Sequence, residues 1–375
     1  MTPLESRLAV ELRPVPGGWQ VRLRLRRPVA ACRLLEGRTG PEALSLIPRL
    51  YGICGHTHRQ AAGLALAAAG ALSDQGDAAR RRAALARLES VREHLLGILG
   101  TWPRLLRLQP AAAVPGEAAE AVARTQALME APEAGLQTLR AWVSERVFGR
   151  PAAEFLALDA SSLERWWRAG ATEAARLLSR AARYALARAG ETPQLPRECA
   201  RVLGAELAGP QWSAFVSRPV WQDEPAENSV ASAWTGHPLI RELRRRRPEA
   251  FLLHRFTARL LELARQLESP TGDEPARVTR PAPGTALAEV PSPRGRLFHY
   301  AACTQGRVDR YRILAPTEWN FHPRGPAVQA LKGIPADSPG EARMLAEAVI
   351  HALDPCVAFT VAVEGPMEMR RAGHA

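Results

Sequence analysis

The sequence predicts a mainly α-helical α+β protein with small β pieces near both ends of the 375-residue chain. Apolar residues recur at helical spacing through the middle of the chain. Strict alternation of apolar and polar residues is confined to the start and to a region near residue 300. Hydrophobic residues make up 46% of the chain, enough to bury a sizeable core, and the length suits one large domain or two ordinary ones.

Residues 1–30 are predicted to form a β-hairpin. Two runs of apolar residues alternate with polar neighbours: Leu8, Val10 and Leu12, and then Trp19, Val21, Leu23 and Leu25. Between them, the segment from Pro14 to Gly18 supplies residues typical of a turn.

A helical body is predicted over residues 42–268. One clear amphipathic stretch has apolar residues three or four positions apart: Leu88, Val91, Leu95 and Ile98. Ser161 followed by Glu164 matches a capping box and predicts a second, long helix running toward Gly190. A third helix is expected after Pro248 because apolar residues again follow helical spacing: Phe256, Leu260, Leu263 and Leu267.

Residues 269–362 are predicted to form a β and loop region that includes one more helix. The segment from Pro270 to Pro293 is rich in Pro, Gly and Thr, which predicts a loop or extended connection. A short mixed β region from Leu297 to Leu314 follows, and a final helix is expected from about Glu341 to Leu353. Residues 363–375 are expected to be a tail.

The net charge of +12 is compatible with nucleic-acid binding, but the pattern of the charge does not favour it. Nearly all of the positive charge is arginine, with Lys332 as the single lysine, and Ala is also very abundant, which indicates a coding bias. The densest run, Arg244 to Arg247, shares its helical stretch with Glu242 and Glu249 and is typical of a solvated helix face. No nucleic-acid partner is therefore expected.

Nothing in the sequence predicts export or a membrane partner. Met1 to Pro14 lacks the apolar core of a signal peptide, and the longest uncharged apolar stretch, Ala61 to Leu72, is short of the ~20 residues that cross a bilayer. The cysteines are odd in number and scattered: Cys32, Cys54, Cys199, Cys303 and Cys356. This usage fits a reducing cytoplasm, where thiols serve packing, metal or redox chemistry.

One short segment gathers candidate metal ligands. Residues 49–61 have the sequence R-L-Y-G-I-C-G-H-T-H-R-Q-A, which places Cys54, His56 and His58 within five positions. Thiolate and imidazole are common ligands of borderline metals, so these residues could form part of a metal site. The alternative is a loop with a buried cysteine and surface histidines, and the spacing alone leaves both open.

A second motif, Asp354-Pro355-Cys356, follows the final predicted helix. Together the two segments resemble the signature regions of nickel–iron hydrogenase large subunits, R-x-C-G-x-C-x-x-x-H and D-P-C-x-x-C-x-x-H. The first segment keeps most of its motif: Arg49, Gly52, Ile53, Cys54, His58 and Ala61. Tyr51 replaces its first cysteine, and Phe359 and Ala362 replace the second cysteine and the histidine of the second motif.

Segments in between extend this resemblance over roughly residues 17–362. Leu35-Glu36-Gly37-Arg38 stands at the family's distance upstream of the first motif, with Cys32 where the family has a glutamate implicated in proton transfer. Pro293-Arg294-Gly295, followed by His299, resembles the segment whose arginine contacts the cyanides on iron. The segment 316–320, P-T-E-W-N, is close to the family's P-T-x-W-N, whose start lines the diatomic ligands. Two further segments, Glu93-His94 and His237-Pro238-Leu239, resemble the family more weakly.

The resemblance implies a depleted metal site. In the family, the first cysteine of each pair binds nickel alone, and the second bridges nickel to iron. This chain retains one bridging position, Cys54, and one terminal position, Cys356, and neither Tyr51 nor Phe359 supplies a soft donor. No stable nickel and no enzymatic activity are therefore expected. Iron that already carries carbon monoxide and two cyanides, Fe(CN)2CO, needs only one or two thiolates.

The same resemblance implies roles for individual residues. Cys54 and then Cys356 are the expected iron ligands, with Cys32 a further candidate whose alternative is a small buried hydrophobe. Arg294 and Thr317 are expected to donate hydrogen bonds to the cyanides. Pro293 and Pro316, next to these two residues in the sequence, are also expected to line the cofactor site. His58 is expected to support the loop of the first motif rather than to bind metal. Cys199 and Cys303 are expected to be structural.

The pattern as a whole resembles hydrogenase expression/formation proteins of the HupK/HoxV type, degenerate homologues of the large subunit. It implies one large-subunit-like domain over residues 1–375. The expected function is a cytoplasmic scaffold that receives Fe(CN)2CO from assembly proteins of the HypC/HypD type and passes it to the large subunit. The alternatives are a metal-free chaperone that mimics the large subunit and an active or sensory hydrogenase. No C-terminal processing is expected, because the motif histidine is absent.

Overall fold

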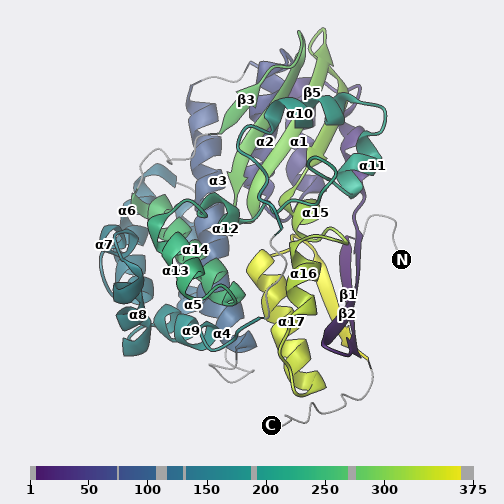
Figure 1. The fold of residues 1–375 in the computed structure, drawn as a ribbon. Helices are drawn as coiled ribbons and strands as arrows, with labels where there is room; N and C mark the ends of the chain where they lie inside the picture. The colour runs from purple at the N-terminus through teal and green to yellow at the C-terminus, as the bar shows by residue number, and fades with distance from the viewer. Residues whose placement is uncertain are drawn as a thin grey trace.

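A computed structural model describes residues 6–73, 76–106, 116–129, 132–186, 192–268 and 276–364. Helices dominate it, together with a three-stranded and a four-stranded sheet in the described part of the chain. The four-stranded sheet lies in the upper part of the view, and the small sheet lies in the lower part near α16 (Pro326–Lys332) and α17 (Pro339–Leu353) (Figure 1). The predicted mainly helical α+β class is confirmed.

The predicted N-terminal hairpin is confirmed. Strands β1 (Arg7–Val15) and β2 (Gly18–Arg26) pair antiparallel, with Leu8 opposite Leu25, and Gly17 turns the chain at φ 86°. The sequence did not predict a third strand, β7 (Ala358–Val363), which pairs parallel to β1. Parallel neighbours need a long connection, and here almost the whole chain supplies it. The remainder of the expected tail, 365–375, lies outside the described residues.

The first half of the helical body contains the predicted amphipathic helix. Residues Leu88, Val91, Leu95 and Ile98 are all fully buried. They belong to α3 (Asp77–Leu95) and the π-helical turn η2 (Leu96–Thr101) that continues it. The neighbouring elements are η1 (Val29–Leu35), α1 (Gly40–Leu50), α2 (Gly55–Ala68), α4 (Trp102–Leu105), α5 (Gly116–Leu128), α6 (Pro132–Val143), η3 (Ser144–Phe148) and α7 (Ala152–Leu156).

The single long helix predicted from Ser161 toward Gly190 is wrong. The chain forms two short helices, α8 (Ala160–Ala169) and α9 (Glu173–Ala181), because Gly170 takes a left-handed conformation and ends the first. The cap of α8 is Asp159, whose carboxylate accepts the N–H of Ser162 at 2.6 Å. Part of the stretch toward Gly190 lies outside the described residues.

The third predicted helix is confirmed as α14 (Phe251–Glu268), which begins after Pro248 and is buried along most of its length. Before it come α10 (Ala200–Ala208), α11 (Trp212–Ser217), α12 (Val230–Ala233) and α13 (Pro238–Arg246). On α13, Glu242 accepts hydrogen bonds from Arg245 and Arg246, as is typical of a solvated helix face.

Among the described residues, no helix is both long and apolar enough to span a bilayer.

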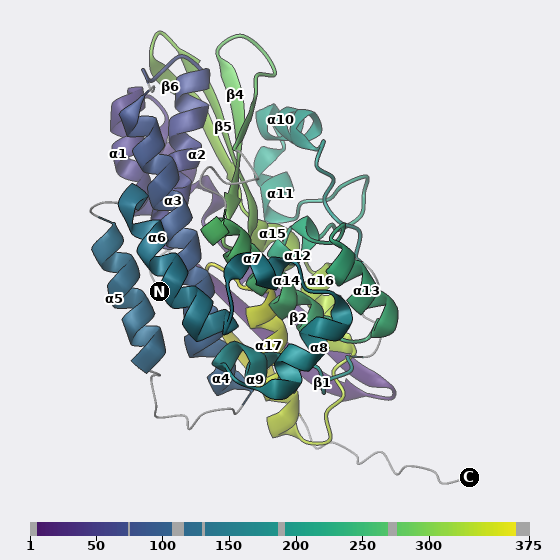
Figure 2. The same cartoon turned by 90° about the vertical axis from the view of Figure 1, so that its left-hand side faces the viewer.

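The second sheet is larger than predicted. It is antiparallel in the order β3 (Arg277–Thr279), β4 (Thr285–Ser292), β5 (Gly295–Thr304) and β6 (Arg307–Leu314). The predicted β region is confirmed as β5 and β6, but the expected loop from Pro270 to Pro293 is wrong over β4. That strand is buried over most of its length, and its one proline, Pro291, lies near its end. Helices α1 and α2 lie on one side of this sheet and α10 and α11 on the other (Figure 2).

The final predicted helix is confirmed as α17 (Pro339–Leu353), preceded by α15 (Pro316–Asn320) and α16 (Pro326–Lys332). The largest buried cluster joins strand residues from both ends of the chain, such as Leu8 and Val361, to residues of α3, α14 and α17. Contacts between side chains also bring together four segments that are distant in the sequence. These are the beginnings of α2 and α15, the β4–β5 turn and the end of α17.

Candidate functional site

Cys54 lies directly before α2 in a left-handed conformation (φ 58°) and is 7% exposed. The first turn of this helix is held by Glu89 of α3, which is 2% exposed. Its carboxylate accepts the N–H groups of His56 (3.1 Å) and Thr57 (2.9 Å) and the hydroxyl of Thr57 (2.8 Å). A carboxylate is favoured at a helix N-terminus because it satisfies free N–H groups and faces the positive end of the helix dipole. Helix α3 thus fixes the turn that carries Cys54.

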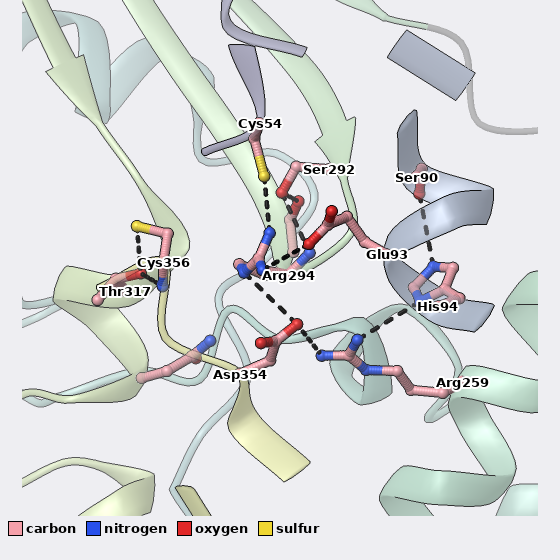
Figure 3. Close-up of polar contacts among 12 residues, drawn as sticks. Cys54, Ser90, Glu93, His94, Arg259, Ser292, Arg294, Thr317, Asp354 and Cys356 are labelled. Carbon is pink, nitrogen blue, oxygen red and sulfur yellow. Dashed lines mark hydrogen bonds and ion pairs between the residues drawn. The ribbon is translucent and has the colours of Figure 1, made fainter. Parts of the chain in front are cut away.

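Arg294 connects Cys54 to two carboxylates (Figure 3). Its Nη1 donates to Cys54 Sγ at 2.7 Å, its Nη2 donates to Glu93 at 3.0 Å, and its Nε lies 3.4 Å from Asp354 Oδ2. The side chain is 9% exposed. Burial opposes its charge, but Asp354, Cys54 and Glu93 raise the pKa of Arg294 well above its ordinary value. The site therefore contains a permanent buried cation in contact with a thiol.

The β4–β5 turn that presents Arg294 is tightly packed. Pro293 is buried, and Gly295 has φ 134°. A Cβ atom on Gly295 would lie 2.1 Å from the carbonyl oxygen of Asn228. The side chain of Asn228 also accepts the N–H of Arg296 at 2.9 Å and donates to its carbonyl at 2.8 Å. These contacts fix the direction in which the guanidinium leaves the sheet.

Asp354 connects the second motif to the same arginine. It ends α17 in a left-handed conformation, and its carboxylate accepts a hydrogen bond from Arg259 Nη2 at 2.9 Å. Burial raises the pKa of this carboxyl, but Arg294 and Arg259 outweigh burial and hold it below the usual value. Arg259 Nη1 in turn lies 3.4 Å from His94 Nδ1. The aspartate of the motif is therefore a charged anchor between two buried arginines.

Cys356 is held against the start of α15. Its Sγ lies 3.0 Å from the hydroxyl of Thr317, where either atom can donate, and its N–H donates to the same hydroxyl at 3.3 Å. Thr317 is 1% exposed and follows the buried Pro316. Asp354, two residues before Cys356, lies 3.4 Å from Arg294, which contacts Cys54. The two retained cysteines therefore belong to one site, although they are 302 positions apart in the sequence.

His58 belongs to a buried hydrogen-bonded chain. Tyr51 stacks on its ring at 4.5 Å, its Nδ1 lies 2.9 Å from His299 Nε2, and His299 Nδ1 lies 2.7 Å from the hydroxyl of Tyr311. Burial lowers the pKa of His58 well below its usual value and that of His299 to about 3. Both rings are therefore neutral at pH 7, and they join α2 to the second sheet.

The remaining predicted residues lie apart from these contacts. Cys32 is fully buried and donates to the carbonyl of Val29 at 3.2 Å, and its pKa is raised to about 11, mainly by burial. These contacts favour the buried-hydrophobe alternative. Phe359 lies on β7, edge-on to His351 at 4.9 Å. In the described part of the chain, no three His, Cys, Asp or Glu side chains gather as a metal site.

Burial also determines whether the thiol of Cys54 is protonated. It raises the pKa of Cys54, against the opposing charge of Arg294, so the thiol is protonated when no metal is bound. A metal that binds there must displace this proton.

Several residues of the site carried little signal in the sequence. Glu89 lies within an ordinary helical stretch, and Arg259 and Arg27 are among many arginines. Arg27, at the end of β2, pairs with Glu318 at 2.6 Å, and their side chains are 12% and 4% exposed. By contrast, Glu93 and Asp354 could be found from the sequence, because they belong to segments that resemble the family.

Comparison with known proteins identifies similar sequences and folds. A family model for nickel-dependent hydrogenase matches residues 241–362. The chain is 32% identical to the hydrogenase expression/formation protein HoxV of Cupriavidus necator, over 89% of this chain and 91% of that one. It is 31% identical to the hydrogenase expression/formation protein HupK of Azotobacter vinelandii, over 96% and 99%. The solved Ni-Fe-Se hydrogenase from D. vulgaris Hildenborough has the same fold, with a TM-score of 0.56 and 16% identity over 92% of this chain and 94% of that one.

Proposed function

Because this chain belongs to the family of HoxV- and HupK-type hydrogenase expression/formation proteins, we propose that it is a scaffold in hydrogenase maturation. Its cargo is the Fe(CN)2CO unit, which it holds transiently on Cys54, with Cys356 assisting. Assembly proteins of the HypC/HypD type supply the unit, and the hydrogenase large subunit receives it. The exchange takes place in the cytoplasm.

The contact between Arg294 and Cys54 is the observation that carries this proposal. A thiol and a buried, permanently charged guanidinium lie 2.7 Å apart. Iron bound to the sulfur brings its cyanides to the same place, and a cyanide nitrogen accepts hydrogen bonds from a guanidinium. Thr317 offers a hydroxyl beside Cys356 in the same way. The buried Pro293 and Pro316 flank these two donors.

The sparse ligand set supports release rather than turnover. Tyr51 and Phe359 take the places of two thiolates, so the unit gains at most two sulfur ligands here. In a large subunit both bridging cysteines bind iron, whereas this chain retains one bridging position, Cys54, and binding through more soft ligands is stronger. Transfer to the large subunit is therefore favourable, and the protein acts without catalytic turnover of its own.

A second candidate function is a metal-free chaperone that mimics the large subunit. The observation in its favour is the large-subunit fold, which extends over 92% of this chain in one comparison. Such a protein would bind the partners of the large subunit through its surface alone.

Infrared spectroscopy of protein purified after co-expression with the assembly proteins tests the scaffold. We expect bands in the cyanide and carbonyl stretching regions, and their loss in Cys54→Ser. Cys303→Ser is the matched control, because Cys303 is also buried but lies on β5 away from these contacts. Absence of the bands from the parent protein would contradict the scaffold.

Complementation separates the two candidates. The chaperone predicts that hydrogenase maturation survives a Cys54→Ala/Cys356→Ala double variant, because the surface is unchanged. The scaffold function predicts that hydrogenase maturation is lost in this double variant.

A further inference from the structure

Arg27, which directly follows β2, pairs with a carboxylate next to the residue that contacts the second retained cysteine. Arg27 Nη1 is 2.6 Å from Glu318 Oε1, and both side chains are largely buried. Glu318 directly follows Thr317, whose hydroxyl contacts Cys356 Sγ at 3.0 Å. Guanidinium and carboxylate therefore form a buried pair, one residue along the chain from the hydroxyl that contacts the Cys356 thiol.

The electrostatics of Arg27 agree with this placement. Burial opposes the charge of Arg27, yet its pKa is raised, with Cys356 the strongest opposing cause, followed by Glu318 and Tyr51. Cys356 and Tyr51 stand at the first cysteine position of the two motifs. Through Glu318 and Thr317, Arg27 therefore lies on the Cys356 side of the site, where the large subunits that this chain resembles attach nickel alone.

We infer that Arg27, paired with Glu318, fills the nickel side of the site and is the residue that makes the protein reject a divalent metal there. The site then has two unlike halves. In one half, Cys54 and Arg294 can receive a metal complex. In the other half, next to Cys356, the Arg27–Glu318 salt bridge takes the place of a metal. The identity of the cargo rests on the proposed function, whereas the exclusion of nickel does not.

Three properties of the guanidinium support this exclusion. It has five N–H donors and no lone pair, so it cannot bind a metal, and it keeps its proton at any physiological pH. Its positive charge repels a divalent cation, and salt screens this repulsion little in a buried site. Glu318 is the partner that allows the charge to be buried at all.

Nickel titration of the reduced, metal-free protein tests the inference. In the wild type and in Arg27→Lys, which keeps the charge, we expect no thiolate-to-nickel charge-transfer absorption and no rise of the thermal unfolding midpoint. Arg27→Met removes the positive charge and leaves the Glu318 carboxylate without its partner, so its nickel affinity should rise on the order of tenfold or more. The new absorption should disappear when Cys356→Ser is added.

A second variant keeps the test valid if the first folds poorly. Arg27→Met leaves a buried carboxylate unpaired, whereas Arg27→Met/Glu318→Gln removes both charges and should still bind nickel more tightly than the wild type. Nickel binding by the wild type through Cys356, or no gain in either variant, would overturn the inference. The infrared experiment on the iron unit has an independent readout, so failure of the scaffold and failure of this inference are distinguishable.

Discussion

Replacing Glu89 by glutamine should loosen the turn that carries Cys54. The carboxylate accepts three hydrogen bonds, from the N–H groups of His56 and Thr57 and from the Thr57 hydroxyl. Glutamine keeps one acceptor oxygen but turns an NH2 group toward these donors, which leaves at least one of them without a partner. Each buried donor left unsatisfied costs about 1–3 kcal/mol, and loss of the charge at the helix N-terminus adds about 0.3–1 kcal/mol. We therefore expect the free energy of unfolding to fall by roughly 1–4 kcal/mol.

Two measurements follow the effect of Glu89→Gln. Denaturant unfolding gives the loss of stability, with Glu347→Gln as control, because Glu347 pairs with Arg343 on the surface of α17. That control should change stability by less than about 0.5 kcal/mol. The alkylation rate of Cys54, followed by mass spectrometry of the native protein, should rise in Glu89→Gln and stay unchanged in the control.

Two results together would refute the positioning role of Glu89. One is a stability of Glu89→Gln within about 0.5 kcal/mol of the control. The other is an unchanged alkylation rate of Cys54. A loss of stability without faster alkylation would mean that Glu89 supports the fold and leaves the thiol where it is.

Three further predictions concern the surroundings of the site. Burial lowers the pKa of His299 to about 3, so its contribution to stability is complete above pH ~6.5 and is lost as the pH falls toward 3, by up to about 1.4 kcal/mol per pH unit. His299→Gln should reduce the slope of unfolding free energy against pH between about 4 and 6.5 by up to that amount, and an unchanged slope contradicts the assignment. Asp354→Asn removes the carboxylate shared by two buried arginines and should cost about 3–5 kcal/mol in denaturant unfolding; a loss below 1 kcal/mol would show that water replaces it. Gly295→Ala should destabilise the protein by several kcal/mol more than Gly306→Ala, since both glycines have positive φ but only the former lies against backbone, that of Asn228. Equal thermal midpoints of the two variants would speak against the close approach.

Local patterns were sufficient for much of the fold. The alternation of Leu8, Val10 and Leu12 predicted a strand, and the spacing of the apolar residues in α3, α14 and α17 predicted those helices, because each pattern reports which side of a single element is buried. The failures depended on other information. The left-handed turn at Gly170 divides a helix that the apolar pattern leaves continuous, and β4 is buried over most of its length, so that it lacks alternation.

Residue types also determine which ligands are absent. A tyrosine at position 51 and a phenylalanine at 359 supply no thiolate in any conformation, so the loss of two sulfur ligands is a property of the sequence alone. The charges that surround the retained thiols depend instead on packing. Glu89, Arg259 and Arg27 lie far from the motifs along the chain, and they meet Thr57, Asp354 and Glu318 only after folding. Electrostatic energies vary with distance and burial, which a linear sequence does not contain.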